Sequence, residues 1–211
     1  MDVTSTTNPD LAHVVERKEL RYSHKGGELR WHSDTTDVIG LFCLKAAKSG
    51  GESRLASVGA VHNLILENHP ECLDALYEGY FYMSLADDDE EGIQRISHER
   101  VPVFRKSDDT VLFYYIPQVI ERAMNRADIK YSLAENKART IIQESGDIPG
   151  VALEFMLEPG DLEIINNRVV MHSRGEYEDH LDIENRRHLL RLWMATTPEM
   201  MTKTLLTPSD L

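Results

Sequence analysis

The C-terminal half of the chain is a succession of short segments with β-strand character, and this pattern constrains the fold most. Residues 151–157 alternate in polarity, which places Val151, Leu153, Phe155 and Leu157 on one face of a strand. Further strand-like segments follow at about 162–166, 169–173 and 187–194, with a turn at 158–161. A meander of short strands predicts a β-barrel or a β-sandwich.

The N-terminal part adds helices to this pattern. Strands are also predicted at 38–46, a continuous apolar run, and at 80–85 and 111–115. Helices are predicted at 58–67 after the cap Ser57, at 70–77 before Gly79, and from the capping box Ser132–Glu135 to about Ser145, with Gly146 after it. We therefore expect a mainly β single domain over residues 1–211, with flanking helices. It comprises an N-terminal arm or remnant (1–30), a core (31–194) and a C-terminal tail (195–211).

The charge of the chain excludes some partners. Asp and Glu outnumber Lys and Arg by 36 to 23, which gives a net charge of −13 and argues against nucleic-acid and membrane partners. The sequence shows neither a signal peptide nor an apolar stretch long enough to cross a bilayer. Two cysteines, Cys43 and Cys72, form no disulfide framework, and Cys43 lies in an apolar stretch. We expect a cytoplasmic protein that acts on a small molecule.

Three residues form a candidate metal site. His32 and Asp34 are two positions apart, so a strand presents both to one side. His172 lies on another β-like segment and would complete two histidines and one carboxylate, a set that suits iron(II) and leaves coordination positions open. An ordinary structural role is the better interpretation for six of the remaining histidines: His13, His24, His62, His69, His98 and His180. His188 is left out because it would lie on the opposite face of its strand from Arg187 and Arg191.

The segment 187–194 carries a second signal. Arg187, Leu189, Arg191 and Trp193 share one face, and the opposite face is mostly apolar and predicted to be buried. An arginine inside a barrel needs an anion, because desolvating a lone guanidinium costs several kcal/mol. A dicarboxylate held between iron and an arginine would satisfy this need. Structural ion pairs with acids such as Glu163 or Glu154 are the alternative.

Taken together, the sequence resembles the taurine dioxygenase family of iron(II)- and 2-oxoglutarate-dependent oxygenases. The resemblance covers about residues 31–194 and rests on WHSD (31–34), GGES (50–53), GDLEIINNRVVMHSR (160–174) and RRHLLRLW (186–193). It implies a double-stranded β-helix, or jelly roll, that uses iron(II), 2-oxoglutarate and dioxygen. It also implies roles for individual residues. These are His32, Asp34 and His172 as metal ligands, Arg187 and Ser53 as contacts of the distal 2-oxoglutarate carboxylate, and Arg191 as a contact of an anionic substrate group.

Family members usually have a substantial segment before the first histidine, whereas 31 residues precede His32 here. We therefore expect a shortened N-terminal part and an exposed sheet edge that a second subunit would cover. The presence of Asp34 disfavours halogenation, since related halogenases lack this carboxylate. Two alternatives stay open: a non-catalytic metal-binding β-helix protein, and a cupin-type metalloenzyme that does not use 2-oxoglutarate. The acidic run 87–91 is predicted to be a solvated loop, with a divalent-cation site as the alternative.

Overall fold

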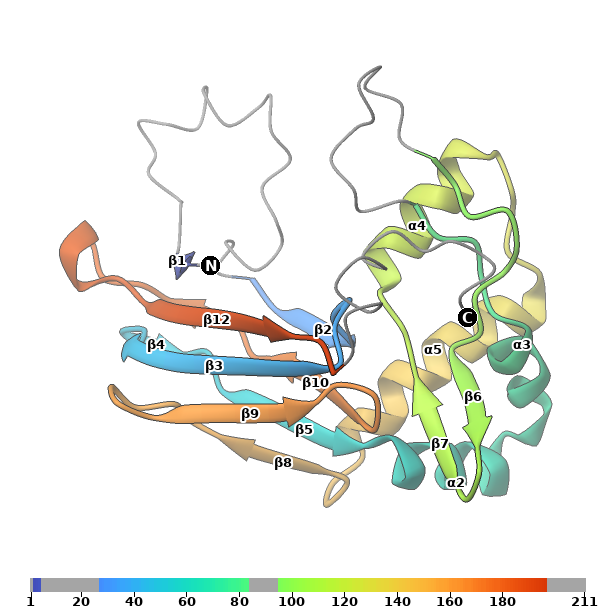
Figure 1. Ribbon diagram of the computed structural model, residues 1–211, viewed down its shortest axis with the longest axis horizontal. Coiled ribbons are helices and arrows are strands. Elements are labelled where there is room, and N and C mark those ends of the chain that lie inside the picture. Colours follow the sequence, from blue (N-terminus) through green and yellow to red (C-terminus); the bar gives the residue numbers. More distant parts are fainter. Residues whose placement is uncertain (1, 5–26, 84–94, 197–211) are drawn as a thin grey trace.

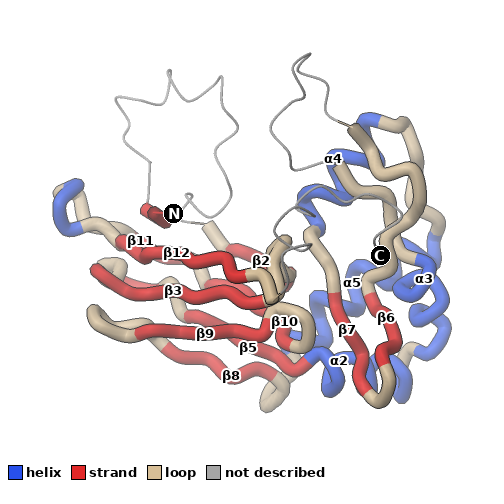
Figure 2. Tube along the Cα trace, viewed as in Figure 1, coloured by secondary structure: helices blue, strands red, loops and turns tan. Residues whose placement is uncertain are grey.

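The computed structural model describes residues 2–4, 27–83 and 95–196. Strands occupy one end of the molecule and helices the other (Figures 1 and 2). One antiparallel sheet has the order β1 (Asp2–Thr4), β12 (His188–Met194), β3 (Val38–Lys45), β9 (Leu162–Asn166). The other has the order β2 (Leu29–His32), β10 (Val170–Arg174), β5 (Ser53–Ser57), β8 (Ala152–Phe155). Side chains from both sheets line one cavity between them. The mainly β prediction and the double-stranded β-helix are confirmed.

The remaining elements join or cover these sheets. Two further antiparallel pairs form. β4 (Ser49–Gly50) pairs with the distant β11 (Tyr177–Glu178), and β6 (Phe104–Ser107) forms a hairpin with β7 (Thr110–Phe113). The helices are α2 (Val58–Asn68), α3 (Leu73–Glu78), α4 (Pro117–Arg126) and α5 (Leu133–Asp147), with 3₁₀ turns at Pro70–Cys72 and Ile183–Asn185. The pair β6–β7 lies at the helical end of the molecule (Figure 2).

The main hydrophobic core lies where the helices meet the second sheet. Ser57 caps α2 through the backbone N–H of Ala60, and Ser132 and Glu135 form the predicted capping box of α5. Trp31 of β2 joins α5 to the sheet. Its indole Nε1 donates to Asp147 Oδ1 at 2.8 Å, and its backbone exchanges hydrogen bonds with the Gln143 side chain.

Gly146 was predicted to follow α5, but it lies inside the helix, which ends at Asp147. A Cβ atom at this position would lie 2.5 Å from the Trp31 ring and 2.6 Å from the Met171 side chain. The glycine therefore permits close approach of helix and sheet rather than ending the helix.

The strand predicted at 80–85 does not form over its described residues. Tyr80 and Met83 make only isolated bridges, with Val101 and Ile96. Their aromatic and apolar side chains are buried in the helical core, so burial rather than sheet pairing explains their composition. Residues 84 and 85, and the acidic run 87–91, lie outside the described residues.

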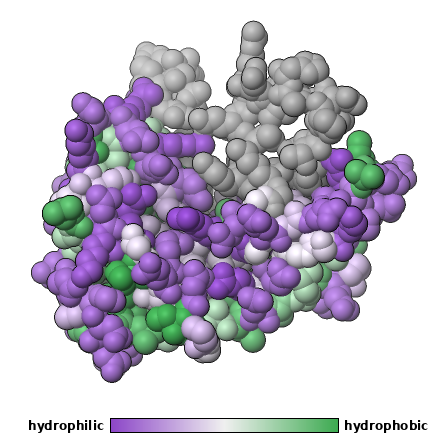
Figure 3. All heavy atoms as spheres, turned by 180° about the vertical axis from the view of Figure 1, so that it is seen from behind, coloured by the Kyte–Doolittle hydropathy of each residue, from purple (hydrophilic) through white to green (hydrophobic). Residues whose placement is uncertain are grey.

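The outer face of the first sheet is more exposed than the sequence predicts. The face of β12 opposite the arginines was expected to be buried, yet Leu192 is 53% and Met194 38% exposed. The arginine-bearing face points into the cavity instead. Leu153 of β8 is also exposed, because β8 is an edge strand whose apolar residues do not all reach a core. Apolar side chains thus lie among mostly hydrophilic ones on the surface, as the rear view shows (Figure 3).

The first residues of the predicted arm form a strand, since Asp2 pairs with Leu190 along the edge of the first sheet. Within the described ranges, no helix combines the length and apolarity needed to traverse a bilayer.

Candidate active site

Antiparallel pairing of β2 and β10 brings two histidines together. His172 lies directly opposite His32, and the centroids of their rings are 4.2 Å apart. Asp34 follows in the loop after β2, where the Asn167 side chain accepts a hydrogen bond from its backbone N–H at 2.9 Å. One candidate ligand atom from each of the three residues lies within 4.8 Å of the others. The three residues singled out from the sequence therefore meet at one point.

The electrostatic surroundings keep both imidazoles neutral. Burial lowers the pKa of His32, and burial together with the neighbouring His32 lowers the pKa of His172 to about 3. Burial alone would raise the pKa of Asp34, but the two histidines, Arg191 and a hydrogen bond from Trp193 hold it below its ordinary value. At neutral pH the site thus presents two neutral rings and one carboxylate, the protonation state that a metal ion requires.

Hydrogen bonds orient these groups toward a common point. His32 Nδ1 lies 2.7 Å from the carbonyl oxygen of Arg30, so Nδ1 carries the proton and Nε2 offers its lone pair. His32 Nε2 is 3.7 Å from Oδ1 of Asp34. The other oxygen, Oδ2, accepts hydrogen bonds from Trp193 Nε1 at 2.9 Å and Arg191 at 3.3 Å.

One buried nitrogen atom indicates that a further group can bind at this point. Nδ1 of His172 is buried and has no hydrogen-bond partner within the described part of the chain. A buried polar atom without a partner is unfavourable unless something else satisfies it. The donor set of two imidazoles and one carboxylate fits a divalent iron ion.

A cavity of about 60 Å³ extends from these ligands between the two sheets. Its far part is lined by Ser53, Glu163, Arg174 and Arg187, whose exposed fractions are all 7% or less. Ser53 donates to Glu163 at 3.1 Å. The guanidinium carbons of Arg174 and Arg187 lie 4.6 and 5.3 Å from the Tyr177 ring. Arg187, Ser53 and Arg191, all expected from the sequence, thus share one cavity with the three candidate ligands.

The charges in this cavity are only partly compensated. Burial and the nearby Arg187 lower the pKa of Arg174 to about 10, and burial lowers the pKa of Arg187. Burial raises the pKa of Glu163, against the hydrogen bond from Ser53 and the charge of Arg187. A cavity with two close guanidinium groups is suited to an anion.

Sequence reasoning did not assign site roles to Glu163, Arg174 and Trp193. Glu163 is the polar member of the inward face of β9, which alternates with the exposed Leu162 and Ile164. An acid at an inward position of an otherwise apolar strand is the signal that could have identified it. The indole of Trp193 could not have been placed, because its contact with Asp34 depends on how β12 aligns with the loop after β2.

Most other histidines have local partners. His62 Nε2 is 2.9 Å from the Tyr77 hydroxyl, and His188 Nε2 is 2.9 Å from Asp2. His69 lies 3.8 Å from Glu71. The contacts of His62 and His69 agree with the structural roles predicted for them, whereas His13 and His24 lie outside the described residues.

Comparison with known proteins gives a consistent result. The family described as "Taurine catabolism dioxygenase TauD, TfdA family" matches residues 2–193. FR-33289 synthase of Streptomyces rubellomurinus is 30% identical over 183 residues, covering 85% of this chain and 53% of the synthase. An asparagine oxygenase, solved in complex with Fe(II), 2S,3S-3-hydroxyasparagine and succinate, superposes with a TM-score of 0.68 at 21% identity. The superposition covers 92% of this chain and 56% of the asparagine oxygenase chain.

The non-heme iron oxygenase OrfP, in complex with Fe and alpha-ketoglutaric acid, superposes with a TM-score of 0.60 at 15% identity, over 98% of this chain and 60% of that one. The chain thus spans little more than half the length of these proteins.

Proposed function

Because the chain belongs to the TauD, TfdA family of iron(II)- and 2-oxoglutarate-dependent oxygenases, we propose that it is itself such a dioxygenase. It would oxidise an unactivated C–H bond of a small molecule, by hydroxylation, with release of succinate and CO₂. One observation carries the proposal. Two neutral histidines and one carboxylate converge in the same cavity as a buried arginine.

His32, Asp34 and His172 would hold iron(II). The ion supplies activation of dioxygen when 2-oxoglutarate and substrate are in place. The protein supplies ligand geometry. The Arg30 carbonyl fixes the tautomer of His32, and Trp193 and Arg191 hold one oxygen of Asp34 so that the other can face the metal.

Arg187 would bind the distal carboxylate of 2-oxoglutarate together with Ser53. Arg187 is only 7% exposed, and a guanidinium so deeply buried is stabilised by an anion. The Ser53 hydroxyl, which donates to Glu163 in this structure, would turn to the carboxylate, and donation from serine and arginine in different directions would fix its orientation. A cupin-type enzyme without 2-oxoglutarate would have no use for this buried pair, so 2-oxoglutarate dependence separates the two activities.

The substrate would be a small anionic or amino-acid-like molecule. The asparagine oxygenase complex contains a hydroxylated amino acid, which supports the amino-acid-like alternative for a related fold. The contact of Arg191 with an anionic substrate group stays a prediction, because in this structure a terminal nitrogen of Arg191 contacts Asp34.

Succinate production tests the proposed activity. We expect the purified protein to form succinate from 2-oxoglutarate in the presence of iron(II) and dioxygen, and Asp34→Ala and His172→Ala to lose this activity while remaining folded by circular dichroism. His188→Ala, which removes a histidine bound to Asp2 on the other face of β12, controls for the substitution itself. Equal succinate formation in all variants would refute the metal assignment. A non-catalytic metal-binding protein would bind iron and form no succinate.

A further inference from the structure

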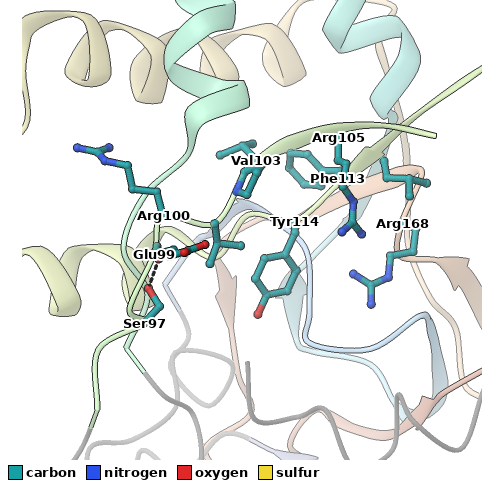
Figure 4. A pocket seen from close by; sticks show the side chains of 11 residues that line it. Ser97, Glu99, Arg100, Val103, Arg105, Phe113, Tyr114 and Arg168 are labelled. Atoms are coloured by element: carbon teal, nitrogen blue, oxygen red, sulfur yellow. Dashed lines mark hydrogen bonds between the residues drawn. The ribbon is translucent and has the colours of Figure 1, made fainter. Parts of the chain in front are cut away.

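A second cavity, of about 220 Å³, lies at the helical end of the molecule (Figure 4). Three arginines line it: Arg100, Arg105 and Arg168. Its other walls are mainly apolar, from Val101 to Val103 and from Leu112 to Tyr114. Nothing in the proposed metal or co-substrate chemistry uses this cavity.

The cavity adjoins the loop that carries Asp34. Its wall residue Tyr114 stacks on Tyr82 with ring centroids 5.2 Å apart, and burial raises the pKa of Tyr114, while the charge of Arg168 lowers it and that of Asp34 raises it. The next residue, Tyr115, accepts a hydrogen bond from the backbone N–H of Ser33 at 2.8 Å. The cavity therefore lies next to the loop that carries Asp34, although it shares no lining residue with the cavity that contains the three candidate ligands.

The three arginines differ in how far their charges are already compensated. Arg100 forms ion pairs with Glu135 at 2.5 Å and Glu78 at 3.3 Å. Arg168 donates to Asp37 through Nε at 2.8 Å, which leaves its terminal nitrogens available to a ligand. The side chain of Arg105 is exposed and makes no hydrogen bond or ion pair with any residue that the structure describes.

The arrangement of these charges favours an anion on one side of the cavity. In Figure 4 the guanidinium groups of Arg105 and Arg168 lie on one side of Tyr114, and Glu99 lies on the other. Glu99 is the only carboxylate among the lining residues, and it is exposed. Asp37 compensates the charge of Arg168 in part, so Arg105 supplies most of the positive charge on this side.

Arg191 cannot easily supply this positive charge, because it is engaged with Asp34 and stacks on Trp193 at 4.5 Å. Withdrawing it would remove a donor from the candidate metal ligand. We propose that the Arg105–Arg168 side of this cavity binds the anionic group of the substrate, while the apolar walls and Tyr114 hold its body. The ligand class is a small organic anion bearing a carboxylate, sulfonate or phosphate. This assignment rests on the proposed function, since the body of the bound substrate would extend from this cavity past the Asp34 loop toward the metal.

Anion binding to the full chain tests the assignment without turnover. Inorganic phosphate, ethanesulfonate and butyrate are titrated separately by calorimetry at low ionic strength, and the tightest of them identifies the anionic group. We expect Arg105→Gln to weaken that binding about tenfold, the effect of losing one charge-assisted hydrogen bond. Lys106→Gln is the matched control, because Lys106 is an exposed neighbour on β6 that does not line the cavity. Lys106→Gln should change the anion affinity less than twofold, because the loss of an exposed charge outside the cavity has only a small electrostatic effect.

Two outcomes would overturn the assignment: no measurable binding of any of the three anions, or equal weakening by both substitutions. Iron and 2-oxoglutarate binding is measured in the same Arg105→Gln protein. If iron and 2-oxoglutarate fail to bind while Arg105-dependent anion binding persists, the proposed function fails and the anion site stands. If both bind normally and the anions do not, the anion site alone is wrong.

Discussion

Asp34 uses its two oxygens for different purposes. Oδ1 faces His32, whereas Oδ2 is held by the indole of Trp193 and by Arg191. Such outer contacts commonly tune metal affinity by roughly 10- to 100-fold. The residues around the ligands therefore contribute to metal binding by orienting the ligands.

Trp193→Phe tests this division. The substitution removes the Nε1 donor and keeps an aromatic ring beside Arg191. We expect iron(II) affinity to fall about tenfold, because Asp34 loses the hydrogen bond that orients it. Anaerobic titration of the apo-protein with iron(II) measures the change. Unaltered affinity would mean that the indole does not position the carboxylate.

Glu163 makes stability depend on pH. Burial raises its pKa in the folded protein, so the folded state holds this proton more tightly than the unfolded state. The free energy of unfolding should therefore decrease as pH rises from the ordinary glutamate pKa, about 4.3, through the raised folded value. Glu163→Gln removes this loss, so its advantage over the wild type should grow as the pH rises above about 4.

Urea unfolding at several pH values measures this difference. Glu158→Gln, at the exposed turn before β9, controls for the loss of one acidic residue. A Glu163→Gln advantage that is constant with pH, or that shrinks as pH rises, would contradict a raised pKa.

At the scale of the elements, Gly146 shows how a tertiary contact overrides local signals. A glycine near the end of a helical pattern predicts a C-terminal cap, but here it admits Trp31 against α5. Gly146→Ala should destabilise the protein by about 1–3 kcal/mol through overpacking, although alanine is the better helix former.

Gly59→Ala is the matched control for that substitution. Gly59 lies in the first turn of α2 and is exposed, and a Cβ atom added there would have only the Ser57 side chain near it, at 3.8 Å. We expect Gly59→Ala to stabilise the protein by up to about 1 kcal/mol. Denaturant unfolding measures the free energy of unfolding of both variants. If Gly146→Ala stabilises the protein, α5 and Trp31 can move apart without loss of stability, which contradicts the prediction.

Local sequence signals predicted most elements. The apolar run of β3, the Ser57 cap of α2 and the capping box of α5 each act through neighbouring residues, and each was placed within a few positions. Pairing between distant strands could not be predicted in this way. The inward face of β12 was recognised by its arginines, but the exposure of Leu192 depends on what lies beyond the sheet, which no local pattern records.

The candidate site was more predictable than the burial pattern. His32 and Asp34 were predicted to share one face of a strand. Asp34 lies instead in the loop after β2, yet both residues meet His172 at one point, and Arg187 lines the same cavity. The second cavity was not predictable, because Arg105, Tyr114 and Arg168 come together only through the packing of β6, β7 and the turn before β10.

At the scale of the whole molecule, the candidate metal site lies between the two sheets, and the second cavity lies among β6, β7 and the turn before β10. Ligands that bind only the folded state stabilise it by mass action. Iron(II) with 2-oxoglutarate, each at about a hundredfold excess over its dissociation constant, should add roughly 2.7 kcal/mol per independent site. Anaerobic thermal unfolding should show a higher Tm for the wild type and none of this gain for Asp34→Ala.

The most direct test of the central claim is anaerobic loading of the apo-protein with iron(II), followed by addition of 2-oxoglutarate. We predict a weak visible charge-transfer band of the metal chelate, lost in His172→Ala and requiring much more 2-oxoglutarate in Arg187→Ala. Iron binding without any band would contradict a 2-oxoglutarate site and favour a metal-binding protein of another kind. Failure to bind iron at all would contradict the assignment of His32, Asp34 and His172.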